Sequence, residues 1–132
     1  MFCREQVAQF LEVAEDIESR GAGLVLASTG NPHFAKTFRE DRNVTVPLVV
    51  DPSGAIYEAA QWRTSLGSTV SLATMKNARR ATAAGFRQGR TRGLPFQQGG
   101  VLVVQPDHTI GFRYESEVAG DHPAIADVLA AL

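Results

Sequence analysis

The sequence predicts a single α/β domain in which helices flank a central mixed sheet. Three observations predict this class. Helical and strand-like segments alternate along the 132 residues. Residues 24–50 form a strand–helix–strand unit of the length that joins parallel strands. Residues 101–114 have the pattern of an antiparallel hairpin, and a last helical segment follows. The chain length suits one domain spanning residues 1–132.

The first half of the chain has clear start and stop signals. A helix is expected over residues 3–20, because apolar residues recur at helical spacing on one face, and the glycines after it end it. That face consists of Val7, Phe10, Leu11, Ala14 and Ile17. The apolar run 24–27 predicts a strand buried on both faces. Asn31 is expected to cap a helix that ends near Asp41.

The second half is less regular. Residues 46–50 predict a strand, with a turn after it. A helix is expected over residues 72–86, and glycines predict a mobile loop from there to Gly100. The final helix is expected to be capped by the Asp121-His122 pair, with a proline in its first turn.

Composition excludes several classes of protein. Hydrophobic residues make up 44% of the chain, so a folded core is expected. No apolar run approaches the roughly 18 residues that span a bilayer, and no secretory signal opens the chain, so no membrane partner is expected. Cys3 is the only cysteine, which excludes an internal disulfide. A single cysteine fits a reducing compartment, and we expect a cytoplasmic protein.

Charge is distributed unevenly. Residues 59–106 carry seven basic side chains and no acidic one, between two segments with an excess of acidic residues. Such a block either attracts an anion, with Arg90 and Arg92 as candidates, or pairs with the acidic ends of its own fold. The sequence pI of 6.3 is well below the value of about 9 typical of nucleic-acid binders, so no nucleic-acid partner is expected.

No cofactor is expected. The three histidines lack the partners that metal ligands need, so no metal site is predicted. The glycine-rich stretch before the hairpin matches neither of the common nucleotide-binding patterns.

Four segments, in order along nearly the whole chain, carry a family resemblance. They are Phe2-Cys3-Arg4-Glu5-Gln6, Val46-Pro47-Leu48-Val49-Val50-Asp51-Pro52, Gln97-Gln98-Gly99-Gly100 and Ala119-Gly120-Asp121-His122-Pro123. Together they resemble the peroxiredoxin-like branch of the AhpC/TSA (alkyl hydroperoxide reductase/thiol-specific antioxidant) family. The resemblance implies a thioredoxin-like three-layer sandwich. It also implies chemistry at a thiol that starts the first helix after a central strand.

Cys3 is therefore the candidate nucleophile, and elementary electrostatics favour the same residue. Free N–H groups and the positive end of the helix dipole favour thiolate over thiol at a helix start, and Arg4 adds positive charge. The resemblance places Gln98, Gly99 and Gly100 in a loop facing this thiol. The expected substrate is a peroxide or a disulfide. Because the chain has no second cysteine, the expected reductant is an external thiol of the glutathione or thioredoxin type.

One alternative remains open. Cys3 could be a small apolar residue packed at the helix start. The chain would then be a catalytically degenerate thioredoxin-like module that binds a partner or forms a homodimer. Peroxiredoxins also place an arginine just before the hairpin, where this chain has glutamines.

The sequence departs from the family at its beginning. The first residue of the family's thiol motif would precede Met1, and so would the central strand. We therefore expect a domain truncated at its N-terminus, with two sheet edges left open. A fragment or a misassigned start would explain this, as would a strand donated by a partner or a rearranged sheet.

Overall fold

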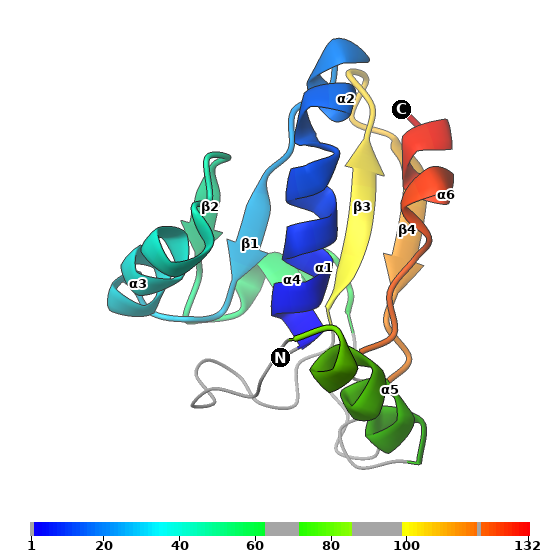
Figure 1. Ribbon diagram of the computed structural model, residues 1–132. Helices are drawn as coiled ribbons and strands as arrows, with labels where there is room; N and C mark the ends of the chain where they lie inside the picture. Colours follow the sequence, from blue (N-terminus) through cyan, green and yellow to red (C-terminus); the bar gives the residue numbers. More distant parts are fainter. Residues whose placement is uncertain (1, 63–71, 86–98, 119) are drawn as a thin grey trace.

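The computed structural model describes residues 2–62, 72–85, 99–118 and 120–132. Helices and strands alternate as the sequence predicted, which confirms the α/β class (Figure 1). The helices are α1 (Phe2–Glu12), α2 (Ala14–Ser19), α3 (Pro32–Arg42), α4 (Ala55–Ala59), α5 (Leu72–Ala83) and α6 (Ile125–Ala130). The strands are β1 (Leu26–Ser28), β2 (Leu48–Val50), β3 (Gly100–Val104) and β4 (Ile110–Glu115).

The four strands lie in two small sheets. β1 and β2 are parallel, with Leu26 opposite Leu48 and Ser28 opposite Val50, as the crossover unit predicted. β3 and β4 are antiparallel, with an irregularity after Val103. A parallel pair joined by a helix, then a hairpin and a terminal helix, is the thioredoxin-like outline that the sequence predicted.

Among the residues that the structure describes, no strand pairs with the edges of β1 and β3 that face away from their partner strands. Within the described ranges, β1 pairs only with β2, and β3 only with β4. In Figure 1, α1 runs lengthwise between β1 and β3. The sequence predicted a missing strand at this place, and no described strand lies there. The sheet is divided because nothing among these residues supplies the hydrogen bonds that would join its halves.

The hydrophobic core lies between the first helices, the hairpin and α6. Its buried residues are Phe10, Ile17, Val103 and Val128, and half-buried residues of α6 pack against them. Each fully buried side chain of this size contributes about 1.5–3 kcal/mol to folding. The apolar face predicted for the first helix supplies Phe10 and Ile17 to this core, and that of the last helix supplies Val128, whereas Val7 and Leu11 of the first face lie outside it.

The predicted helix over residues 3–20 is interrupted at Val13. There the backbone N–H donates to the Phe10 carbonyl, a tighter three-residue spacing than that of an α-helix. The end of the helix follows the prediction, because Gly21 adopts a φ of +79°. Its N–H and the next one return to carbonyls of α2, which is the usual glycine C-cap.

The prediction that the strand at residues 24–27 is buried on both faces was wrong. β1 begins two residues later, and the Val25 side chain is 58% exposed. Ala27 in the middle of β1 is exposed as well. A parallel strand is buried on both faces where helices cover both faces of its sheet, and within the described residues β1 belongs to a sheet of only two strands.

The crossover helix α3 is capped as predicted. The Asn31 side chain accepts a hydrogen bond of 2.8 Å from the Phe34 N–H, and Pro32 occupies the first helical position. After β2, Asp51 organises the predicted turn. Hydrogen bonds from Ser53 and from the Ile56 N–H hold the pKa of the Asp51 carboxyl below its usual value.

Aromatic side chains beyond β2 link the two sheets. The Tyr57 hydroxyl donates to the Ala27 carbonyl of β1 at 3.1 Å. The Tyr57 ring meets the Trp62 ring edge-on, with centroids 5.3 Å apart. The Trp62 indole lies against Gly100 at the start of β3, where an added Cβ would come within 2.8 Å of the indole nitrogen. The absence of a side chain at Gly100 allows this contact.

The rest of the second half agrees with the predictions except at its end. α5 and the hairpin form where expected, whereas the predicted mobile loop and its Arg90, Arg92 and Gln98 lie outside the described residues. The prediction that Asp121 caps the last helix was wrong. α6 starts at Ile125, with no side-chain cap at its N-terminus. Pro123 precedes α6, and the Asp121 carboxylate is bound by Tyr114 and by the Glu117 N–H.

Candidate functional site

The first turn of α1 carries the candidate thiol. The backbone of Cys3 lies in this turn, as the sequence predicted. The first four N–H groups of a helix have no partner within the helix. Arg4 and Glu5 follow in the same turn, the former half-buried and the latter buried. The two charged side chains have different environments, which divide the site into two parts.

The buried part is an ionic cluster around Glu5. This carboxylate, in a residue that is only 6% exposed, accepts a hydrogen bond of 3.1 Å from the Arg80 guanidinium of α5. The His122 Nε2 lies 3.9 Å from the same carboxylate oxygen, and its side chain is 10% exposed. A buried carboxylate needs such partners, because burial without them is costly.

The cluster ties together three distant parts of the chain. Arg80 also donates to the Gly120 carbonyl at 3.0 Å, so one guanidinium joins α1, α5 and the segment before α6. Glu5 and His122 belong to the first and last segments that carry the family resemblance. The sequence prediction missed this cluster and placed His122 in a helix cap. The only signal was the presence of both residues in those segments.

Asp121 holds the segment before α6 in place. Its carboxylate accepts a 2.6 Å hydrogen bond from the Tyr114 hydroxyl of β4 and one of 2.9 Å from the Glu117 N–H. The hydrogen bond to Asp121, together with burial, raises the pKa of Tyr114 to about 12. These two hydrogen bonds hold the loop that carries His122, and the His122 side chain lies near Glu5.

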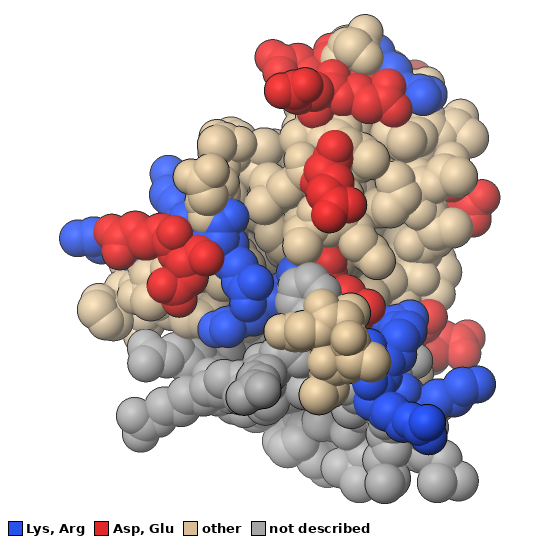
Figure 2. Space-filling model, viewed as in Figure 1, with Lys and Arg blue, Asp and Glu red and all other residues tan. Residues whose placement is uncertain are grey.

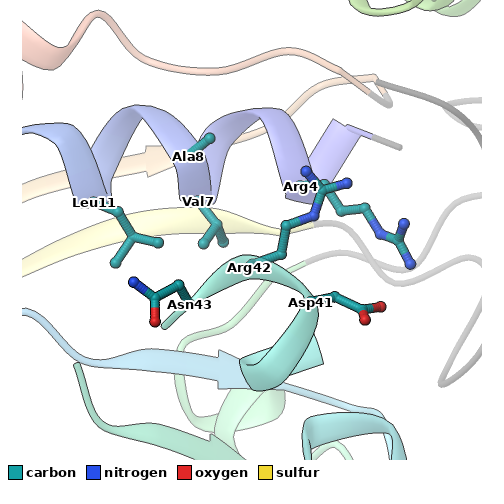
Figure 3. A pocket seen from close by; sticks show the side chains of 7 residues that line it. All are labelled: Arg4, Val7, Ala8, Leu11, Asp41, Arg42 and Asn43. Carbon is teal, nitrogen blue, oxygen red and sulfur yellow. The ribbon is translucent and has the colours of Figure 1, made fainter. Parts of the chain in front are cut away.

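The second part of the site is a cavity on another side of α1. It has a volume of about 320 Å³ and lies between α1 and the C-terminal end of α3. Figure 3 shows Leu11 and Val7 along one end and Arg4 at the other, with Arg42 reaching up from α3 toward Arg4. Arg4 makes no ion pair or hydrogen bond with any other described residue.

The predicted loop before the hairpin is described only in part. Gly99 and Gly100 are half-buried at the start of β3, and Gly100 lies against Trp62. Whether these glycines and Gln98 face Cys3 stays a prediction.

Within the described residues, the cationic block of residues 59–106 forms an ion pair with an acidic side chain through Arg80. Figure 2 shows Lys and Arg side chains gathered over α5, with acidic side chains beside them. Arg80 from this block pairs with Glu5 from the acidic first segment. This pair favours the interpretation that the block balances the acidic ends of the fold.

Comparison with known proteins identifies the family. The profile of the AhpC/TSA antioxidant enzyme family matches residues 9–117. The chain belongs to this family. Membership confirms the resemblance seen in the sequence and implies a redox-related role of the thioredoxin-like class. The match begins after Cys3, so the role of that residue rests on other grounds.

One curated relative resembles the chain along almost its whole length. It is "Thioredoxin-like protein AAED1, chloroplastic" from Arabidopsis thaliana, 26% identical over 140 residues. The alignment covers 99% of this chain and 56% of the relative, so the chain spans about half of that protein's length. No solved structure gives a significant match.

Two features are absent from the described residues. No helix among them is long and apolar enough to cross a membrane. No three His, Cys, Asp or Glu residues among them gather as metal ligands would.

Proposed function

We propose that this chain is a thiol-dependent oxidoreductase of the peroxiredoxin-like type, with Cys3 as the nucleophile. The observation that carries the proposal is the position of Cys3 in the first turn of α1, in a chain of an antioxidant family. Unpaired N–H groups and the helix dipole favour the thiolate at such a position. The neighbouring Arg4, which lines an open cavity, adds a positive charge without a described counter-ion.

The proposed chemistry has two steps. In the first, the Cys3 thiolate attacks one oxygen of a peroxide, the O–O bond breaks, and the other oxygen leaves as an alcohol or water after taking a proton. Cys3 becomes a sulfenic acid. In the second, two external thiols reduce the sulfenic acid to the thiol, releasing water and forming a disulfide between themselves. A disulfide substrate would instead be opened by thiolate exchange.

The ionic cluster has a positioning role in this proposal. Glu5 is two residues from Cys3 and is held by Arg80, which also binds the carbonyl of Gly120. These contacts fix the first turn of α1 against α5 and the segment before α6. A fixed first turn keeps the direction of its N–H groups constant, which preserves their effect on the thiolate.

An external reductant is required because the chain has one cysteine. A small thiol of the glutathione type or a thioredoxin would fill this role in a reducing compartment such as the cytoplasm. The relative's name places that protein in the chloroplast.

The test is the rate of peroxide or disulfide reduction with an external thiol. Cys3→Ser should abolish it while leaving the circular dichroism spectrum unchanged. Ser19→Ala, a change to an exposed hydroxyl at the far end of the two helices, is the matched control and should retain full activity. Full activity of the Cys3→Ser protein would overturn the proposal.

A second function is favoured by the open sheet edges. Val25 beside β1 and Val104 at the end of β3 are each 58% exposed, and both strands have an unpaired edge within the described residues. Open edges accept strands from other chains. Under this hypothesis the chain forms homodimers or binds a partner in an extended conformation. Sedimentation should then show a dimer that Val25→Lys dissociates, and a monomer at all concentrations would rule the homodimer out.

A further inference from the structure

The cavity between α1 and α3 has a distinctive division of charge and apolar surface. Its volume of about 320 Å³ lies at the low end of the range for small-molecule sites. Val7, Ala8 and Leu11 give it an apolar wall along α1. Arg4 and Arg42 place two guanidinium groups toward the N-terminal end of α1, as Figure 3 shows.

The charged end also has negative character. Asp41 lines the cavity from α3 and has no ion pair or hydrogen bond of its side chain with other described residues. The C-terminal end of α3, with its half-charge of negative sign, lies beside it. A ligand with only negative charge would be repelled by Asp41 and by the negative end of the α3 dipole. A ligand with one carboxylate and one ammonium group matches both signs.

We propose that this cavity binds the amino-acid head group of a small zwitterionic thiol. Its carboxylate contacts Arg4 and Arg42, because guanidinium groups bind carboxylates through paired hydrogen bonds. Its ammonium group lies toward Asp41 and the end of α3. Its methylene groups pack on Val7 and Leu11.

The position of the cavity connects it with the proposed thiol chemistry. Arg4, which lines the charged end of the cavity, directly follows Cys3 in the first turn of α1. The charged end of the cavity is also the end of α1 that carries Cys3. The bound thiol is thus the external reductant. This assignment of role rests on the proposed function, whereas the binding itself does not.

The experiment measures binding without chemistry. S-methylglutathione, a zwitterionic tripeptide whose sulfur cannot react, is titrated into the 15N-labelled Cys3→Ser chain and followed by NMR. We expect saturable shifts at the amides of Leu11 and Asn43, with a dissociation constant of about 1 mM or tighter. The dimethyl ester of the same probe, which lacks carboxylates, should bind at least about tenfold more weakly.

Two variants test the assignment of residues. Arg42→Gln should weaken binding about tenfold or more, because a charged hydrogen bond is lost. Arg39→Gln removes the same charge from the same turn of α3 outside the cavity lining and should leave the affinity within twofold.

Three results would overturn the inference. They are the absence of binding at 20 mM probe, equal effects of Arg42→Gln and Arg39→Gln, and equal binding of inorganic phosphate and S-methylglutathione. If the probe binds as expected but the wild-type chain does not reduce peroxides or disulfides, the site stands and the proposed function fails. If the chain is active but the probe does not bind, the proposed function stands and the proposed binding site fails.

Discussion

Replacing Glu5 with glutamine tests whether the ionic cluster stabilises the first turn of α1. The substitution keeps the shape of the side chain and removes its charge. Breaking a fully buried ion pair costs about 3–5 kcal/mol, and an exposed pair contributes at most about 1 kcal/mol. Glu5 is 6% exposed, but the Arg80 side chain is 53% exposed, so the pair lies between these limits. We therefore expect a loss of about 2 kcal/mol in the free energy of unfolding.

Urea denaturation followed by circular dichroism measures this loss. Glu12→Gln is the control, because Glu12 ends the same helix, is exposed and has no described ion pair. It should change the free energy of unfolding by no more than about 0.5 kcal/mol. A double-mutant cycle with Arg80→Met should give a coupling energy of about 1 kcal/mol. Equal losses for the two glutamine variants, or additive effects in the cycle, would refute a stabilising role for the pair.

Three other predictions concern the scaffold around the site. The pKa of Tyr114, raised to about 12 from 10, means that its hydrogen bond to Asp121 stabilises the fold below pH 10 and is lost between pH 10 and 12. Tyr114→Phe should therefore lower the stability at pH 8 and show a shallower further loss over that interval; parallel curves for both proteins would contradict this. Trp62→Ala should cost about 3 kcal/mol, because it removes the aromatic link between the sheets, and hydrogen exchange should accelerate in β1 and β3 together. Unchanged exchange in β1 would argue against the link. Asn31→Ala should cost about 1 kcal/mol by thermal denaturation, since it removes the cap of α3, and a loss below about 0.3 kcal/mol would contradict the capping role.

Local signals in the sequence predicted local structure well. Asn31 followed by proline marked the start of α3, and Gly21 marked the end of α2, because each residue type satisfies a backbone requirement at that position. The parallel pair followed from the length of the crossover. The hairpin followed from two strand-like runs on either side of a turn.

Features that depend on distant residues were not predictable in this way. The pairing of Glu5 with Arg80 and His122 joins residues far apart in sequence, and nothing in any one segment indicates it. The exposure of β1 likewise depends on what lies beside it. The role of Asp121 was likewise not predictable from its own segment. A residue suited to a helix cap was instead bound by Tyr114, because a tertiary partner was available.

The reactivity of Cys3 decides between the catalytic and the non-catalytic interpretation of the chain. Its rate of alkylation by iodoacetamide can be measured from pH 5 to pH 10 in the folded protein, with the urea-unfolded chain as reference. If the first turn of α1 activates the thiol, the rate should follow an apparent pKa well below the free value of about 8.5, and unfolding should restore that value. An apparent pKa at or above 8.5 in the folded chain would mean an inert, packed cysteine and would contradict the proposed chemistry.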